Sequence, residues 1–239
     1  MTALMDMLSL KGLEHLIRGP LVWVAFVVFI VGLVFQCVRM MRLTRKRKMP
    51  PQIYKKPQTK RRFSRWMRDG LVFLRVSVLG ATPCMAVISF IFHTCLILTP
   101  FLVTAHNVLL DTSFGVSFVS LSERTTDGLT LIVLFCGIFF LTRRMVVRRV
   151  RAISGPADFI LLAVATGPYL TGFLAYHHLF NYQLMVTLHV LSGEIMLVMI
   201  PFSRFSHMIF FFISRFLIAG EHSRKSASRV WQFAGANSR

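Results

Sequence analysis

Four histidines lie inside strongly apolar stretches of this sequence: His93, His106, His189 and His207. An ionisable side chain inside a membrane-spanning segment costs free energy unless it is satisfied, so its presence points to a function. A single histidine could be explained by a hydrogen bond to a backbone carbonyl. Two pairs on two apolar segments favour ligation instead. The chemistry that we expect is axial coordination of haem iron by two imidazoles, one from each segment.

The order of the segments predicts which histidines pair. If apolar segments alternate in direction across a membrane, the two that carry these histidines are antiparallel. His93 should then meet His207 on the inner side, and His106 should meet His189 on the outer side. His189 and His207 are eighteen residues apart, which is roughly 27 Å along one face of a helix. The thirteen residues from His93 to His106 do not return to one face, and Pro100 between them could kink or re-phase that helix.

The residues near these histidines indicate how a cofactor would be held. Gly193 would let a macrocycle or a helix approach closely. Arg204 is a candidate partner for a haem propionate, or a snorkelling cation. Glu194 could relay protons, bond a histidine or simply stay protonated. The cysteines form no CxxC or CxxCH pair, so we expect two non-covalent b haems and small apolar roles for Cys37, Cys84, Cys95 and Cys136.

Composition predicts that these segments are solvated by lipid. The chain has 239 residues, 55% of them hydrophobic, and 23 are Phe. Its net charge of +19 comes in blocks between apolar runs rather than among aromatics on a polar face, which argues against nucleic acid as a partner. We expect an all-α integral membrane protein that forms one domain over 1–239, with spans at about 21–39, 82–110, 128–142, 158–176 and 183–218.

The distribution of cations predicts the orientation. Residues 39–68 carry thirteen Lys and Arg and no acid, and residues 143–151 carry five Arg. The loops that alternate with them are poor in cations. The positive-inside rule therefore puts the N-terminus outside, the loop 40–70 and the C-terminus in the cytoplasm, and an odd number of spans agrees. No cleavage signature precedes the first segment, so we expect it to remain in the mature protein.

Three stretches resemble a known family: "GPLVWVAFVVFIVG", "FHTCLILTPFLVTAHNVLL" and "GPYLTGFLAYHHLFNYQLMVTLHVLSGEIMLVMIPFSRFSHM". They are similar to the membrane cytochrome b family of the respiratory nitrate reductase gamma subunit, above all to its branch in the Tmc and Hmc redox complexes of sulfate-reducing bacteria. The resemblance covers most of 19–218. It implies two haem b groups between the second and fifth spans, ligated by His93, His106, His189 and His207. The spacing in the second span departs from the gamma subunit and suits the Tmc-like branch better.

The same resemblance implies an electron-transfer subunit in a bacterial inner membrane. Such a subunit would connect the quinone pool (menaquinone or another quinone) or a periplasmic multihaem cytochrome c with a cytoplasmic Fe–S subunit similar to heterodisulfide reductase. Catalysis would belong to partner subunits, so no nitrate reduction is implied. A quinone needs an apolar slot with one or two hydrogen-bonding groups. The candidates on the outer side, each of which could instead be an interfacial anchor, are Asn107, Tyr176, His177 and His178.

Three alternatives remain open at this level. A transporter or channel could use the histidines as metal or proton sites, but it predicts several membrane carboxylates, and only Glu194 qualifies. A non-haem membrane anchor subunit predicts dispensable histidines. A stand-alone transmembrane ferric reductase would share the bis-histidine chemistry without needing partner subunits.

Overall fold

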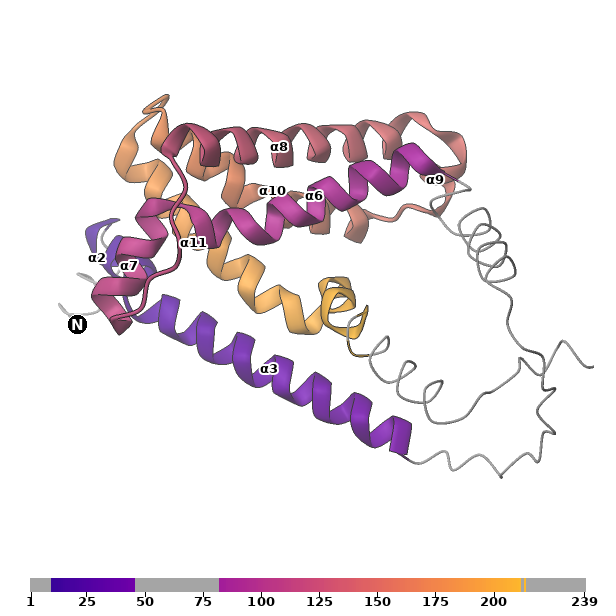
Figure 1. Ribbon diagram of the computed structural model, residues 1–239, viewed down its shortest axis with the longest axis horizontal. Coiled ribbons are helices and arrows are strands. Elements are labelled where there is room, and N and C mark those ends of the chain that lie inside the picture. Colours follow the sequence, from indigo (N-terminus) through magenta and orange to yellow (C-terminus); the bar gives the residue numbers. More distant parts are fainter. Residues whose placement is uncertain (1–9, 46–81, 212, 214–239) are drawn as a thin grey trace, which may run out of the picture.

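The computed structural model describes residues 10–45, 82–211 and 213, and all regular secondary structure in these ranges is helical (Figure 1). Five helices are long and apolar enough to cross a membrane, which confirms the expected class and number of spans. They are α3 (Pro20–Arg45), α6 (Pro83–Leu102), α8 (Glu123–Val146), α10 (Pro156–Tyr176) and α11 (Tyr182–Phe202). Shorter elements are α2 (Leu10–Arg18), α7 (Thr104–Phe114), α9 (Arg148–Ile153) and the 3₁₀ turn η1 (Arg204–Ser206). Most of the expected loop 40–70 lies outside the described residues, and its first residues continue α3.

The continuous spans expected at 82–110 and 183–218 are both broken. In the first, α6 ends at Leu102 and α7 starts at Thr104, with Val103 extended at φ −72° and ψ 127°. In the second, α11 ends at Phe202, η1 follows, and helix resumes at His207. His189 and His207 therefore do not share one helix. Each break follows a proline inside the helix, because proline removes a backbone donor and crowds the preceding turn.

The break at Val103 leaves the last carbonyls of α6 without helical partners, and side chains donate hydrogen bonds to these carbonyls instead. The side chain of His106 donates to the carbonyl of Pro100 at 2.9 Å, and that of Asn107 donates to Phe101 at 3.0 Å. Further back in α6, Pro100 cannot donate to the carbonyl of Leu96, which accepts instead from the hydroxyl of Tyr169 on α10. The break is thus tied into the bundle by side chains.

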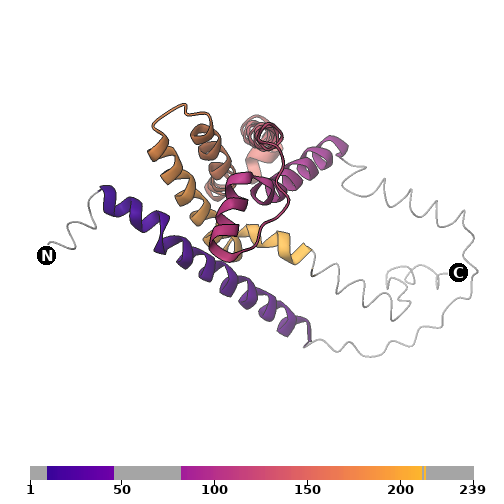
Figure 2. The ribbon, with the colours of Figure 1, turned by 60° about the vertical axis from the view of Figure 1, so that its left-hand side comes forward.

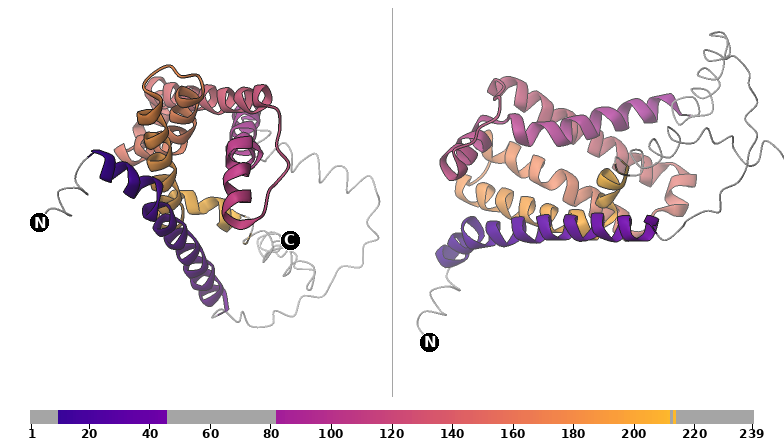
Figure 3. Two further views of the ribbon diagram at one scale, coloured as in Figure 1. Left: turned by 90° about the vertical axis from the view of Figure 1, so that its left-hand side faces the viewer. Right: turned by 60° about the horizontal axis from the view of Figure 1, so that its bottom comes forward.

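The helices pack as an open row rather than a closed bundle. α6 packs on α8, α8 on α10, α10 on α11, and α11 on α3. Figure 2 and the left panel of Figure 3 show α3 at one edge of the row and α6 with α8 at the other. A small core joins the α6 side of the row, formed by Phe92, Cys95, Val133 and Tyr169. In the described part of the chain, α6 and α11 lack an extensive packing interface. His93 and His189 lie within these two helices, but His106 on α7 and His207 after η1 lie outside the spans in which they were expected.

The first and last spans, α3 and α11, run parallel in close contact. At one end Arg18 donates to the carbonyl of Gln183 and the hydroxyl of Thr187, each at 3.1 Å. At the other end Gln36 donates to the carbonyl of Pro201 at 2.8 Å. Between these points Gly32 lies so near Pro201 that an added Cβ would be 2.7 Å from its ring. Glycine is therefore what allows the two helices to approach.

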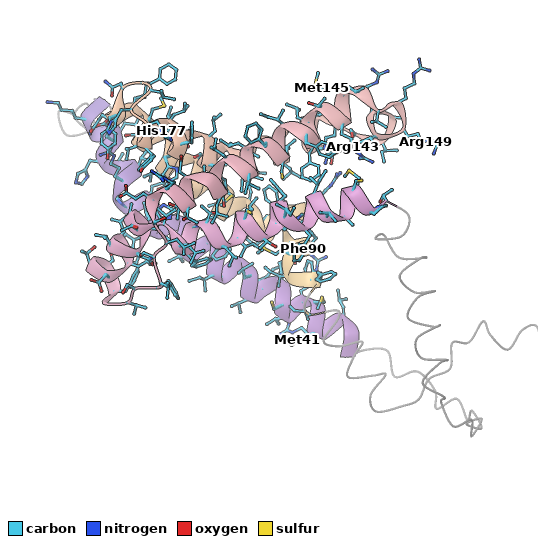
Figure 4. The ribbon with its side chains drawn as sticks, turned by 45° about the horizontal axis from the view of Figure 1, so that its top comes forward. Met41, Phe90, Arg143, Met145, Arg149 and His177 are labelled. Atoms are coloured by element: carbon cyan, nitrogen blue, oxygen red, sulfur yellow. The ribbon has the colours of Figure 1, made fainter. Side chains whose placement is uncertain are left out.

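The two ends of the bundle differ in charge. Figure 4 shows Arg143 and Arg149 at one end and His177 at the other. The basic end carries arginines of α3, α8, α9 and η1: Arg39, Arg42, Arg143, Arg144, Arg148, Arg149, Arg151 and Arg204. The other end carries the acids Glu14, Asp111, Glu123 and Asp127, with few cations. Between the ends, large apolar side chains such as Val31 and Phe135 are 61% and 67% exposed, as expected for a surface that faces lipid.

Replacing Gly32 with alanine should destabilise the protein, because the new methyl group would overlap the rigid ring of Pro201 and push α3 from α11. We expect a loss of about 1–3 kcal/mol in the free energy of unfolding, measured by thermal denaturation in detergent. Gly128→Ala is the matched control, since its Cβ would meet no atom within 4 Å. Equal stabilities of the two variants would contradict the close α3–α11 contact.

Candidate functional site

The candidate pair at the basic end, which was expected on the inner side, consists of His93 on α6 and His207 immediately after η1. Their ring centroids are 5.8 Å apart and their planes are perpendicular, at 90°. The Nδ1 of His93 lies 2.7 Å from the carbonyl oxygen of Ser89, one turn earlier on α6. The Nδ1 of His207 lies 2.6 Å from the carbonyl oxygen of Arg204, in the 3₁₀ turn. Each ring is held by its own local backbone.

The candidate pair expected on the outer side consists of His106 on α7 and His189 on α11. Their ring centroids are also 5.8 Å apart, and their planes meet at 20°. The Nδ1 of His106 lies 2.9 Å from the carbonyl oxygen of Pro100, beyond the helix break. The Nδ1 of His189 lies 2.8 Å from the carbonyl oxygen of Pro168 on the neighbouring α10. Because the helix breaks at Val103, the carbonyl of Pro100 can accept a hydrogen bond from the His106 ring and hold the ring in place.

The same hydrogen-bond pattern at all four rings fixes their tautomer. A backbone carbonyl only accepts, so each neutral imidazole must carry its proton on Nδ1 and donate it. The Nε2 atom is then left with a free lone pair, which is the form that ligates metals. Ligating histidines regularly donate their second nitrogen to a carbonyl in this way, and the bond both orients the ring and raises the basicity of the ligating nitrogen.

The spacing of the rings suits one metal ion between each pair. A metal–imidazole bond is about 2 Å long, so two imidazoles on opposite sides of one metal have ring centroids about 6 Å apart. The separations of 5.8 Å are close to this value. Each ring can turn about its bond to the metal, so perpendicular and nearly parallel planes both fit axial ligation. No group of three or more His, Cys, Asp or Glu side chains gathers among the described residues, and axial ligation of haem needs only two.

Small residues shape the surroundings of His189. A Cβ added to Gly172 on α10 would lie 3.0 Å from Cε1 and from Nδ1 of His189, so the ring rests directly on the backbone. At Gly193, one turn after His189, an added Cβ would meet no atom within 4 Å. Space therefore remains open on the helix face that carries His189. The hydroxyl groups of Thr171 and Ser192 lie 3.2 Å apart, and that of Ser192 donates to the backbone carbonyl of His189 at 2.9 Å.

Arg204 has a protein partner. Its guanidinium donates to the carboxylate of Asp158 at the start of α10, and Arg144 is 3.7 Å from the same carboxylate. The side chain of Arg204 is 71% exposed. Its expected pairing with a haem propionate therefore stays a prediction, in which Asp158 would compete for the same cation.

Among the expected quinone residues, Asn107 already makes hydrogen bonds within the protein. It is 3% exposed, its amide nitrogen donates to the carbonyl of Phe101 and to the hydroxyl of Ser120, and its amide oxygen accepts from the N–H of Phe118. These three bonds hold the 115–122 segment against the α6–α7 break. A quinone could bind Asn107 only by replacing one of them.

The other three expected quinone residues lie at the acidic end. Tyr176 donates to Glu123 at 3.0 Å, and the Nε2 of His177 is 3.0 Å from Asp127. The rings of Tyr176 and His177 are in contact, with centroids 5.0 Å apart, whereas His178 packs on Tyr182. His177 thus meets its partner through Nε2, whereas the other four histidines meet theirs through Nδ1. These four are His93, His106, His189 and His207.

Sequence reasoning missed Pro168 and Gly172, which seat the ring of His189. A signal exists in "GPYLTG", where a proline and a glycine stand four residues apart on one face of a membrane helix. Such a pair marks a place where another side chain can reach the backbone. Of the cysteines, Cys95 is buried in the core as expected, whereas Cys84 is exposed.

Comparison with known proteins gives one relative. A curated protein of Nitratidesulfovibrio vulgaris (Hildenborough), named only "Protein", is 35% identical over 133 residues, which are 56% of this chain and 59% of that protein. The chain thus spans less than two thirds of the length of this relative. No family model matches the chain, and no solved structure matches it. The relative comes from a sulfate-reducing bacterium.

The tautomers can be measured without any cofactor. In the protein labelled with nitrogen-15 at histidine, solid-state NMR should show His93, His106, His189 and His207 with the proton on Nδ1, because each faces a carbonyl there. His177→Gln serves to assign the one ring that meets a carboxylate through Nε2. Protons on Nε2 in the four rings that face carbonyls would contradict this arrangement.

Proposed function

We propose that the chain is a di-haem b-type membrane subunit of a respiratory redox complex. The observation that carries the proposal is the pairing of four imidazoles, each anchored at Nδ1 by a backbone carbonyl and with its ring centroid 5.8 Å from that of its partner. His93 and His189 lie within candidate membrane spans, whereas His106 and His207 lie just beyond the ends of two such spans. His93 and His207 would hold the inner haem, and His106 and His189 the outer one. A bound haem supplies one-electron redox chemistry.

The chain's own residues would orient the two haems and shield them from water. The carbonyls of Ser89, Arg204, Pro100 and Pro168 set the direction of the four rings. The lack of extensive α6–α11 packing among the described residues is consistent with a flat group between these helices, and the open face at Gly193 leaves room beside His189. Both features fit the proposed cofactors.

For orientation, we propose that the basic end faces the bacterial cytoplasm and the acidic end the periplasm. The chain would then have its N-terminus outside. Electrons would pass between the quinone pool or a periplasmic cytochrome c at the acidic end and an Fe–S subunit at the basic end. A place among redox complexes is what the sequence resemblance implies, and it stays part of the proposal. Tyr176, His177 and His178 remain our proposed quinone contacts.

The first experiment is to count haems in the purified chain with a pyridine haemochrome assay. We expect two non-covalent b haems per chain, and one haem after His93→Ala or His207→Ala. We expect the other haem to be lost after His106→Ala or His189→Ala, because each pair shares one iron. His177→Ala is the matched control and should keep both haems, since that ring bonds Asp127.

Other outcomes of this and a related measurement would favour the alternative functions or contradict the pairing. A folded chain without haem would exclude the electron-transfer proposal and favour a transporter or a non-haem anchor. Loss of the same haem from His93→Ala and His106→Ala would contradict the pairing. Reduction of ferric chelates by the purified chain alone would favour a stand-alone reductase.

Gly172→Ala should weaken the outer haem alone. The new methyl group would displace the His189 ring and strain its bond to the Pro168 carbonyl. Losing such an outer-shell contact typically lowers affinity about 10–100-fold. We expect faster loss of one haem on dilution in detergent, followed by absorbance. Gly167→Ala is the control, because its Cβ would make only ordinary contact with Ser192 at 3.8 Å.

A further inference from the structure

Glu194 is a carboxylate buried in the middle of α11. It is 5% exposed, and neither carboxylate oxygen has a hydrogen-bond partner in the part of the chain that the structure describes. Every other acid that the structure describes lies at an end of the bundle. Burying a polar group without a partner is costly, and burying an isolated ionised carboxylate costs far more. Such a residue needs an explanation beyond packing.

The register of α11 places Glu194 on the face toward α3. Thr187, Glu194 and Pro201 are all buried and follow one another at intervals of seven residues. Thr187 accepts from Arg18, the last residue of α2 just before α3, and Pro201 meets Gly32 of α3, so this face contacts the α2–α3 segment at both ends. Glu194 therefore lies midway along the α3–α11 contact. It is also five residues from His189 on the same helix, about 8 Å along the axis.

The elements around Glu194 offer no compensating fixed charge at that level. Over 20–38, α3 has one titratable group, the thiol of Cys37. Over 159–175, α10 has one, Tyr169, whose hydroxyl donates to the carbonyl of Leu96.

The charged groups of the neighbouring elements lie at the two ends. On α2, Lys11, Glu14, His15 and Arg18 are at the outer end, and Arg18 is already bound to Thr187. At the inner end, Arg204 of η1 pairs with Asp158. The ionisable groups nearest in sequence on α11 are His189 and, at its start, Tyr182. His189 is therefore the ionisable group of α11 nearest to Glu194 along the helix, although the two side chains leave the helix about 140° apart.

We propose that Glu194 is a proton-binding site linked to the redox state of the centre held by His106 and His189. This inference rests on the proposed function. Glu194 would be ionised while that centre is oxidised and would compensate its positive charge. On one-electron reduction of the centre by a quinol, cytochrome or Fe–S donor, Glu194 would take up one proton from the solvent, so the net charge of the interior would be unchanged.

The test combines redox titration with infrared difference spectroscopy on the purified full chain loaded with haem. In the wild type, the midpoint potential of the outer centre should fall with rising pH. A carboxylic acid C=O band should appear on reduction and shift in D₂O. Glu194→Gln keeps the size of the side chain but cannot ionise, so it should lose the C=O band and the pH dependence. Glu14→Gln, at the outer end, should retain both.

The outcomes separate this inference from the proposed function. Absence of haem from wild type and variant alike would refute both. Two haems in Glu194→Gln with an unchanged pH dependence would overturn the role of Glu194 alone. If Glu194→Gln does not fold, Glu194→Asp keeps an acid there, and the inference requires that its C=O band still appears on reduction, at a shifted frequency. A band absent from both wild type and Glu194→Asp would overturn the inference.

Discussion

Backbone carbonyls that lose their helical partners cannot be satisfied by lipid, and the rest of this structure depends on how they are satisfied. The chain breaks its helices after Pro100 and Pro201. The freed or nearby carbonyls then receive side chains, and two of these side chains are His106 and His207. The breaks that would otherwise weaken a membrane helix thus orient imidazoles. The same hydrogen bonds therefore stabilise the backbone at the breaks and set the geometry of the candidate site.

The open row of helices is likewise held by a few specific contacts between side chains and backbone. α8 and α10 form the middle of the row, while α6 and α11 flank them without packing extensively on each other in the described residues. Tyr169 fixes α6 to α10 through the carbonyl that Pro100 leaves free, and Gly172 lets His189 reach the backbone of α10. α10 therefore positions α11, which carries His189, and α6, which leads into the α7 helix that carries His106.

Sequence reasoning predicts some features well because they depend on few quantities. The number of spans follows from apolar length alone. The proximity of His93 to His207 and of His106 to His189 follows from the order and direction of the spans, so it holds although neither span is one continuous helix. The site of a break is harder to predict, because Pro100 and Pro201 both lie inside helices that end one or two residues later. The role of Asn107 depends on Ser120 and Phe118, which local pattern cannot reveal.

The parallel contact of α3 with α11 joins the first span to the last, and this has a consequence for assembly. As the chain emerges from the ribosome, α3 enters the membrane long before its main neighbour is made. Each imidazole pair likewise needs one residue from the second span region and one from the fifth, or beyond it. A nascent chain with four inserted spans contains neither pair. Any ligand shared by the two rings of a pair could therefore bind only after the fifth span region is made, and the first span must wait in lipid, or beside an insertion factor, until its neighbour α11 follows.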